Sequence, residues 1–381
     1  MVPGDHLAWG VRLRTCALEG GVGASVHGAV AAPGGRDARV ARPDHAHISA
    51  RRLFRCLRRA GTPPGKWRHQ GRIPSGYGRG VSAERRVVFL VNPGAGSGRV
   101  LARLHAALAP APQLVARART AVVRSLEEAG EVVQGLAPDE VPVAAGGDGT
   151  VNLLARALRA AGMADRPLAT LPLGTGNAFG HPFGLGTVRG ALRAIEAGTP
   201  RLIDVMTTTH SELPLALVSI SAGFESRMLA AVERRPAWRR WLGLVPGLLC
   251  VATRSWTGIG VTVDGEPLVR RAEQVYNAGL YNLPCYGFGW LMWPEADATD
   301  GEAEAVACLS ARAYWRTLHR GLRTAQPSAD GDPRWRRWRR ARFEADGPVQ
   351  IDGEVVSGME FEVAIESRGL SVLVMPGGIL T

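Results

Sequence analysis

The chain has 381 residues, of which 46% are hydrophobic and 21% charged, as is typical of a globular protein with room for two domains. Its formal net charge of +12 first points to a nucleic-acid or anionic-membrane partner. Most of the excess lies in residues 1–80, which carry 14 basic and four acidic residues, so the rest of the chain is nearly neutral. We therefore expect no nucleic-acid partner.

Lysine is almost absent, because Lys66 is the only lysine among the 46 basic residues. Residues 67–381 therefore cannot contain a Walker A lysine, a protein-kinase strand lysine or a pyridoxal Schiff base. The five cysteines are widely spaced and lack zinc-binding spacing, which favours reduced thiols in a cytoplasmic protein. No apolar run reaches the roughly 18 residues of a membrane-spanning helix.

The first 85 residues show little helical or strand periodicity and are rich in Gly, Arg, Pro and His. We expect a disordered extension, or one added by the choice of too early a start codon. The alternative is a basic tail that contacts a membrane or nucleic acid through a short amphipathic helix at residues 48–60.

From residue 86 to residue 200, short apolar strands alternate with helical segments. The expected strands cover residues 87–91, 113–119, 141–145 and 168–171, and the expected helices cover residues 99–109, 120–135, 151–161 and 188–197. This alternation predicts an α/β nucleotide-binding domain with a parallel sheet, whose ligands bind at the carboxyl edge of the strands.

Residues 201–381 are predicted to form a β-rich second domain, an antiparallel sandwich with two helices. The expected strands cover residues 201–208, 215–221, 259–263, 273–281, 302–310, 340–345, 349–351, 361–365 and 371–374. The expected helices cover residues 238–256 and 313–321. The last strand is a candidate to return to the first domain.

Three glycine-rich loops follow strands of the first domain: residues 92–98 (NPGAGSG), 146–150 (GGDGT) and 172–177 (PLGTGN). Glycines let backbone N–H groups approach phosphate oxygens at a helix N-terminus. Asp148 could hold Mg²⁺ or accept a proton from a hydroxyl nucleophile. Alone, GGDGT could equally be a turn that Thr150 caps, but three such loops at one sheet edge favour a nucleotide site.

The order of these loops resembles the catalytic domain of diacylglycerol kinases and their bacterial relatives, a superfamily shared with sphingosine and ceramide kinases. The resemblance implies an α/β domain like that of NAD kinases and phosphofructokinases, followed by a β-sandwich domain. It also implies transfer of the ATP γ-phosphate to a lipid hydroxyl with Mg²⁺, in phospholipid metabolism. Such an enzyme would be cytoplasmic and would associate peripherally with the membrane that holds its substrate.

The resemblance also implies roles for individual residues. The implied nucleotide contacts are Asn92, Gly96, Ser97, Gly147, Asp148, Gly149, Thr150, Gly174, Thr175, Asn177 and Glu354. Asp148 and Asp300 compete for the role of catalytic base, and Asp300 and Asp352 are the implied metal ligands. Glu225, after a Gly-Phe step, is the implied contact of the lipid head group.

Two residues depart from the family pattern. Leu153 replaces the Glu of GGDGTxNE, and Ala178 replaces the Asp of GTGND, which makes that loop more like the one in sphingosine kinases. The acidic DG steps of the second domain also have a simpler reading, because DG is a common hairpin turn.

We therefore expect an ATP-dependent lipid kinase that phosphorylates diacylglycerol or a similar lipid, with a sphingoid base as a possible substrate. One alternative is an NAD kinase-like enzyme with a soluble substrate. Another is a nucleotide- or lipid-binding protein without turnover. The Arg- and Trp-rich segment at residues 334–342 favours either a solvent-facing edge strand or a contact with anionic lipid. The sequence leaves open whether the protein forms a homodimer.

Overall fold

The computed structural model describes residues 85–94, 99–233, 254–293, 296–321, 333–358 and 360–375. The expectations for residues 1–84, for Gly96 and Ser97 in the first loop, and for almost all of the helix predicted at 238–256 lie outside the described residues.

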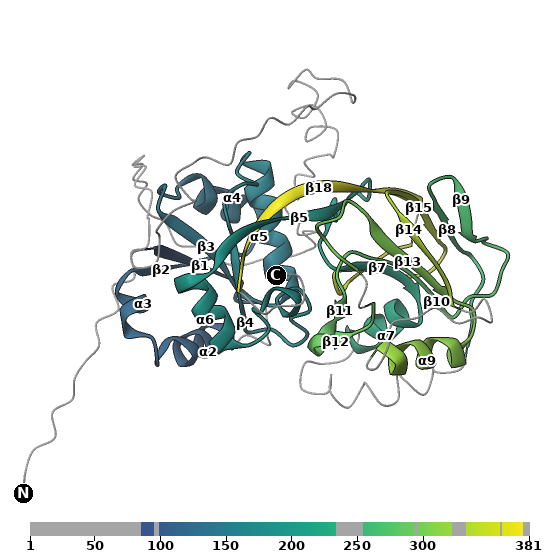
Figure 1. The fold of residues 1–381 in the computed structure, drawn as a ribbon, viewed down its shortest axis with the longest axis horizontal. Coiled ribbons are helices and arrows are strands. Elements are labelled where there is room, and N and C mark those ends of the chain that lie inside the picture. Colours follow the sequence, from purple (N-terminus) through teal and green to yellow (C-terminus); the bar gives the residue numbers. More distant parts are fainter. Residues whose placement is uncertain are drawn as a thin grey trace, which may run out of the picture. The chain divides into compact units, whose positions relative to one another are not determined.

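The first domain contains a four-stranded parallel sheet in the order β2-β1-β3-β4. Its strands are β1 (Arg86–Val91), β2 (Ala118–Val122), β3 (Glu140–Gly146) and β4 (Ala169–Pro172). Its helices are α2 (Val100–Leu108), α3 (Pro112–Ala116), α4 (Leu126–Gln134), α5 (Asp148–Ala160) and α6 (Val188–Ala197). The α/β class and the parallel sheet predicted from the sequence are confirmed (Figure 1).

Both faces of the sheet are buried, which explains the continuous apolar run in β1. Val88 and Leu90 join a core that includes residues of α4 and α5. The alternate residues Phe89 and Val91 join a second core with residues of α2, α3 and α6. The carboxyl ends of the strands, where the glycine loops begin, are thereby fixed between two helix layers.

Two element boundaries differ from the prediction. The strand expected at residues 113–119 is instead the short helix α3, with Pro112 in its first turn, where proline is tolerated, and β2 begins only at Ala118. The helix expected from Thr120 begins at Leu126, because Ser125 caps it. The Ser125 hydroxyl accepts from the Glu128 N–H at 3.1 Å and the Glu128 carboxylate accepts from the Arg124 N–H at 2.7 Å.

The second domain is a sandwich of two six-stranded sheets, ordered β14-β13-β10-β7-β16-β17 and β6-β5-β18-β15-β8-β9. Strands of the first sheet are β14 (Arg334–Trp338), β13 (Ala303–Cys308), β10 (Asn277–Tyr281), β7 (Ser219–Gly223), β16 (Val349–Ile351) and β17 (Glu354–Val356). Strands of the second are β6 (Leu215–Ala216), β5 (Thr199–Thr208), β18 (Glu360–Val374), β15 (Arg340–Ala345), β8 (Ile259–Val263) and β9 (Glu266–Val269). Residues of both sheets share one core, so the predicted β-sandwich is confirmed.

The sandwich also carries helices α7 (Phe224–Glu233) and α9 (Ala311–Gly321), and a hairpin of β11 (Cys285–Tyr286) and β12 (Trp290–Leu291). Helix α7 was not predicted. The strand expected at 215–221 is interrupted at Leu217 and Val218, whose N–H groups donate to the Asp352 carboxylate instead of to a neighbouring strand.

The strands predicted at 361–365 and 371–374 form one long strand, β18, which runs beside β5 (Figure 1). Its register shifts between Glu366 and Leu370, where Arg368 has a left-handed φ of 57°. The buried Asp204 carboxylate holds this bulge by accepting from the Arg368 N–H at 2.7 Å. Beyond the bulge, Val372 bridges to Leu168, next to β4, so β18 joins both domains.

The Arg- and Trp-rich segment forms β14 and β15. Trp338 is buried in the sandwich core. Arg337 forms ion pairs with Asp300, Glu302 and Glu304, so part of the positive charge is neutralised by the neighbouring strand and the turn before it. Within the described residues, no helix is long and apolar enough to cross a membrane.

The sandwich core gives a stability prediction. Phe343 is fully buried and stacks on Phe361 with the ring centroids 5.5 Å apart. We expect Phe343→Ala to lower the free energy of unfolding by about 3–5 kcal/mol, since it removes a large core side chain. Arg342→Ala, at the exposed neighbouring position, should cost less than about 1 kcal/mol. Urea unfolding monitored by circular dichroism tests this. Equal losses of unfolding free energy in the two variants would contradict the placement of Phe343 in the core and of Arg342 at the surface.

Candidate active site

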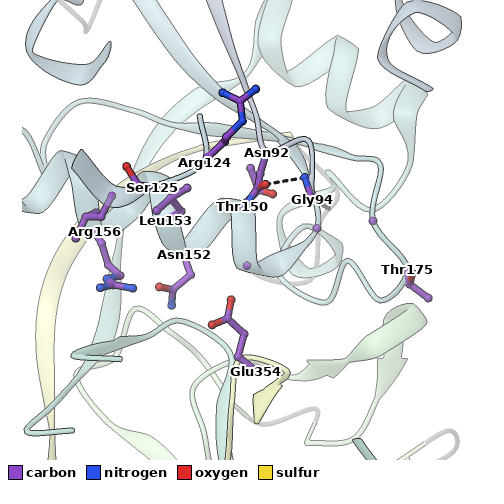
Figure 2. Close-up of a pocket in the computed structure, with 14 residues that line it drawn as sticks. Asn92, Gly94, Arg124, Ser125, Thr150, Asn152, Leu153, Arg156, Thr175 and Glu354 are labelled. Atoms are coloured by element: carbon purple, nitrogen blue, oxygen red, sulfur yellow. Dashed lines mark hydrogen bonds between the residues drawn. The ribbon is translucent and has the colours of Figure 1, made fainter. Parts of the chain in front are cut away.

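A cleft of about 570 Å³ lies where the glycine loops meet the second domain (Figure 2). It is lined by Asn92, Gly94, Arg124, Ser125, Leu126, Gly147, Gly149, Thr150, Asn152, Leu153, Arg156, Gly174, Thr175 and Glu354. Glu354 is the member that comes from the sandwich. The structure therefore brings together all three glycine loops and the turn that precedes β17.

The loop 146–150 leads directly into helix α5, whose N-terminus has no side-chain cap. The first N–H groups of a helix lack intrahelical partners and attract anions. The Thr150 hydroxyl is also buried without a hydrogen-bond partner within the described residues. These donors fit a phosphate group, the ligand predicted for this loop.

Close backbone packing explains the glycines of the second and third loops. A Cβ atom on Gly174 would lie 2.4 Å from the Gly147 Cα, so these two loops can meet only without side chains at this point. Asn177 closes the third loop: its side chain accepts from the Gly174 N–H and donates to the Gly174 carbonyl, both at 3.0 Å. Asn177 therefore shapes the loop through both polar atoms of its side-chain amide. It does not line the cleft, although it was predicted to contact the nucleotide. Thr175 is exposed on the cleft wall.

The first loop is described only as far as Gly94. The side-chain amide oxygen of Asn92 accepts from the Gly94 N–H at 2.9 Å, which leaves the side-chain N–H₂ of Asn92 as a donor at the cleft wall (Figure 2).

Asp148 occupies the first turn of α5 and is oriented by the third loop. Its carboxylate accepts from the Ala178 N–H at 3.0 Å and from the Phe179 N–H at 2.9 Å. Burial raises the pKa of Asp148, while these two donors and the nearby His181 oppose the shift. Ala178 contributes its backbone N–H to this arrangement, so the departure from the family pattern at that position does not remove the contact.

Asp352 is buried and its carboxylate accepts four hydrogen bonds. The donors are the Leu217 N–H (2.7 Å), the Val218 N–H (2.7 Å), the Ser219 N–H (3.1 Å) and the Asn152 amide (2.9 Å). Burial raises the pKa of Asp352 to about 6 against the effect of these donors. A carboxylate has about four lone-pair positions, so this one has no free position for a metal ion. The predicted metal role of Asp352 is therefore replaced by a structural one, in which it ties α5 to the sandwich.

Glu354 follows two residues later and reaches the opposite domain. A Cβ atom on Gly149 would lie 2.8 Å from the Glu354 Oε1. The carboxylate therefore sits at the first turn of α5, as expected for a nucleotide contact of the second domain.

Asp300 does not line the cleft. One of its carboxylate oxygens accepts from the Glu302 N–H at 3.0 Å and the other is bonded to Arg337. The Glu302 N–H and Arg337 thus occupy both oxygens, and the catalytic and metal roles of Asp300 stay predictions. Asp148 is not among the cleft-lining residues either, but Gly147 and Gly149 on both sides of it are, so it is the better placed of the two candidate bases.

Glu225 lies in the first turn of α7 and is fully buried. Its carboxylate accepts from the hydroxyls of Ser221 (2.5 Å), Tyr281 (3.1 Å) and Tyr314 (3.0 Å). Burial raises its pKa against these donors. Glu225 is not among the residues that line this cleft, and its role as a head-group contact stays a prediction.

The donor set can be compared with the needs of Mg²⁺. The described residues contain no group of three His, Cys, Asp or Glu side chains that could hold a metal ion by itself. In phosphate-transferring sites, however, Mg²⁺ is commonly held by one or two carboxylates and by the phosphates of the substrate. Glu354 reaches the first turn of α5, which contains Asp148, so these two carboxylates are candidates to hold Mg²⁺.

Several cleft residues were missed from the sequence: Arg124, Ser125, Leu126, Asn152 and Arg156. The pattern Ser125-x-x-Glu128 is a capping-box signal that would have placed the start of α4, and with it this wall of the cleft. Arg156 follows Asp148 by two helical turns, and nothing in its local sequence distinguishes it from the other arginines of the chain.

Comparisons with known proteins agree with this arrangement. Residues 86–208 match the diacylglycerol kinase catalytic domain family. An uncharacterized protein of Synechocystis sp. is 34% identical over 114 residues, which make up 30% of this chain and 25% of that protein. The match thus spans about a quarter of the length of that relative.

Solved structures from Bacillus anthracis str. Sterne share the fold. A diacylglycerol kinase from this organism superimposes with a TM-score of 0.55 at 20% identity, covering 77% of this chain and 98% of that one. A second structure, provisionally named a diacylglycerol kinase, has a TM-score of 0.59 at 19% identity and the same coverage.

The chain thus carries a kinase-type catalytic domain, built on the glycine loops of a parallel α/β sheet. The match of residues 86–208 to the diacylglycerol kinase catalytic-domain family confirms the resemblance inferred from the three loops.

The contact between the second and third loops gives a prediction. Gly174→Ala forces the two backbones apart, at a cost of about 1–3 kcal/mol in stability, and should weaken ATP binding measured by isothermal titration calorimetry. Gly130→Ala, in α4 with nothing within 4 Å of the new Cβ, is the control and should bind ATP like the wild type. Normal ATP affinity in Gly174→Ala would show that the loop contact does not shape the nucleotide site.

Proposed function

We propose that the protein transfers the γ-phosphoryl group of ATP to a hydroxyl group of a lipid, diacylglycerol or a lipid of similar shape. The observation that carries this proposal is the placement of Asp148, a carboxylate oriented by two backbone N–H groups, at the start of a helix whose own N–H groups face the cleft. A base and a phosphate site thereby occupy the same helical turn.

In the proposed reaction, the α5 N-terminus and Thr150 bind phosphate oxygens of ATP, and Glu354 closes the site from the sandwich. Asp148 accepts the proton of the lipid hydroxyl while that oxygen forms a bond to the γ-phosphorus. The bond between the γ-phosphorus and the β,γ-bridging oxygen breaks, and ADP leaves with its electron pair. When bound, Mg²⁺ would supply positive charge that neutralises the phosphates, with Asp148 and Glu354 as the carboxylates available to hold it.

A buried aromatic cluster of the sandwich supports an apolar acceptor, because a hairpin that packs against it approaches the loop that holds Asp148. The cluster contains Phe224, Tyr276, Tyr281, Met292, Val306, Cys308, Ala313 and Tyr314. Burial and the charges of both Glu225 and Asp148 raise the pKa of Tyr286, a residue packed against this cluster, well above its ordinary value. The hairpin that carries Tyr286 lies beside the third loop, since a Cβ atom on Gly176 would lie 3.7 Å from the Gly287 Cα and 3.5 Å from the Asp148 Oδ2. This favours a lipid over a soluble substrate such as NAD.

A lipid substrate would bring the protein to the surface of a membrane, and we propose a cytoplasmic protein that associates with the membrane peripherally. Incubation with γ-³²P-labelled ATP and Mg²⁺, with diacylglycerol, a sphingoid base, ceramide and NAD as separate acceptors, tests the proposal. Label in a lipid product is the expected result. Label in NAD alone, or no product from a protein that binds ATP, would overturn it.

The choice of base gives a second prediction. Asp148→Asn should lower the rate of lipid phosphorylation roughly 100-fold or more, the range expected when a general base is lost. Asp300→Asn is the matched control and should retain most of the activity, because Asp300 pairs with Arg337 outside the cleft. The reverse outcome would return the catalytic role to Asp300.

The environment of Asp148 also predicts a pH dependence. The base works when deprotonated, and burial raises its pKa, so activity should be lost on acidification at a higher pH than the value of about 3.9 for an ordinary aspartate. The measurement is kcat/KM against pH, with circular dichroism over the same range to show that the protein stays folded. Full activity down to the ordinary aspartate range would contradict a buried base.

A further inference from the structure

Arg156 lies on the cleft wall and is unlike the neighbouring arginines. It belongs to α5 and is partly buried, and its Nε is enclosed without a hydrogen-bond partner in the described part of the chain. Burial lowers its pKa, and only the charge of Glu354 opposes that shift. No ion pair of Arg156 within 4.0 Å is found among the described residues. A buried N–H group that has lost water without gaining a partner is costly.

Arg159, three residues further along the same helix, shows the usual arrangement. Its guanidinium binds the Glu366 carboxylate at 2.6 and 2.9 Å and the Gly369 carbonyl at 2.7 Å. It therefore serves as an internal reference for a structural arginine of α5. Arg156 has the same side chain in the same helix, but its head group faces the cleft and has no such partners.

The position of the guanidinium follows from helix geometry. Side chains in a helix lean toward its N-terminus, so Arg156 reaches back toward the first turns of α5. Figure 2 shows its head group, the Asn152 amide and the Glu354 carboxylate directed toward one part of the cleft. The Glu354 carboxylate reaches Gly149, which marks that part as the beginning of the helix.

The other polar groups there do not satisfy Arg156. Asn152 donates its amide N–H groups to the Leu215 carbonyl and to Asp352. Glu354 is the charge that opposes the pKa shift of Arg156, and its carboxylate also reaches Gly149 at the N-terminus of α5. The single negative charge of Glu354 therefore faces two positive groups, Arg156 and the N-terminus of α5, so a second anion would be bound favourably there.

We propose that Arg156 forms an anion subsite of the cleft and binds a phosphate group of the nucleotide. This assignment rests on the nucleotide part of the proposed function. It gives Arg156 the role that a lysine performs in many phosphate sites, in a chain body from which lysine is absent. Arg124, the other arginine of the cleft, is exposed at the rim and points away from Arg156 (Figure 2), so it does not supply this charge.

Binding measurements on the full chain test the subsite without depending on lipid phosphorylation. The variants are Arg156→Gln, Arg156→Lys and, as the matched control, Arg159→Gln, with the fold of each checked by circular dichroism. The ligands are ATP, tripolyphosphate and adenosine, titrated by calorimetry. Loss of a charge-assisted hydrogen bond should weaken ATP and tripolyphosphate binding by about tenfold or more in Arg156→Gln. Adenosine binding should be unchanged, Arg156→Lys should recover part of the loss, and Arg159→Gln should match the wild type.

The outcomes separate this inference from the proposed function. An ATP affinity in Arg156→Gln equal to that of the wild type would overturn the subsite, even if the protein phosphorylates lipids. Equal losses for ATP and adenosine would also overturn it, since they indicate a change of shape instead of a lost charge. Selective loss of phosphate-bearing ligands in a protein that phosphorylates no lipid would support the subsite and reject the lipid kinase. A wild type that binds neither ATP nor tripolyphosphate would reject both.

Discussion

The Asp352 carboxylate joins the parts of the protein that form the cleft. It accepts from the Asn152 amide of α5 and from three successive backbone N–H groups between β6 and β7. A buried N–H that loses its acceptor costs about 1–3 kcal/mol, so these bonds hold the turn at residues 352–354 firmly against α5. Because that turn also carries Glu354, the same carboxylate sets the position of a charged group at the start of the helix.

This arrangement explains how a protein body without lysine can handle phosphate. The proposed phosphate-binding groups are the N–H groups of α5, the buried Thr150 hydroxyl and the Arg156 guanidinium, all on one helix. Asp148 lies on the same helix and is held by the third loop. A single rigid element therefore carries both the phosphate site and the proposed base, and the sandwich contributes one carboxylate to it.

The sequence predicted the features that depend on local chemistry. The apolar run of β1 and the glycines of GGDGT and PLGTGN identified the sheet edge, because close backbone contacts such as that of Gly147 with Gly174 require glycine. It failed where partners distant in the sequence decide the outcome. Asp352 and Asp300 both occur in DGE tripeptides, but one is enclosed by four N–H donors and the other is paired with Arg337. Arg156 and Arg159 look alike in sequence. Only the fold shows that Arg159 is hydrogen-bonded to Glu366 and Gly369, whereas Arg156 faces the cleft.

We propose that one cleft, formed by the glycine loops and closed by the turn at residues 352–354, binds ATP through its phosphates. The most direct test is a crystal structure of the full chain with Mg²⁺ and a non-hydrolysable ATP analogue. The account predicts phosphate oxygens within hydrogen-bond distance of the N–H groups of residues 147–150 and of the Arg156 guanidinium. An analogue bound elsewhere, or with its phosphates turned away from the N-terminus of α5, would contradict it.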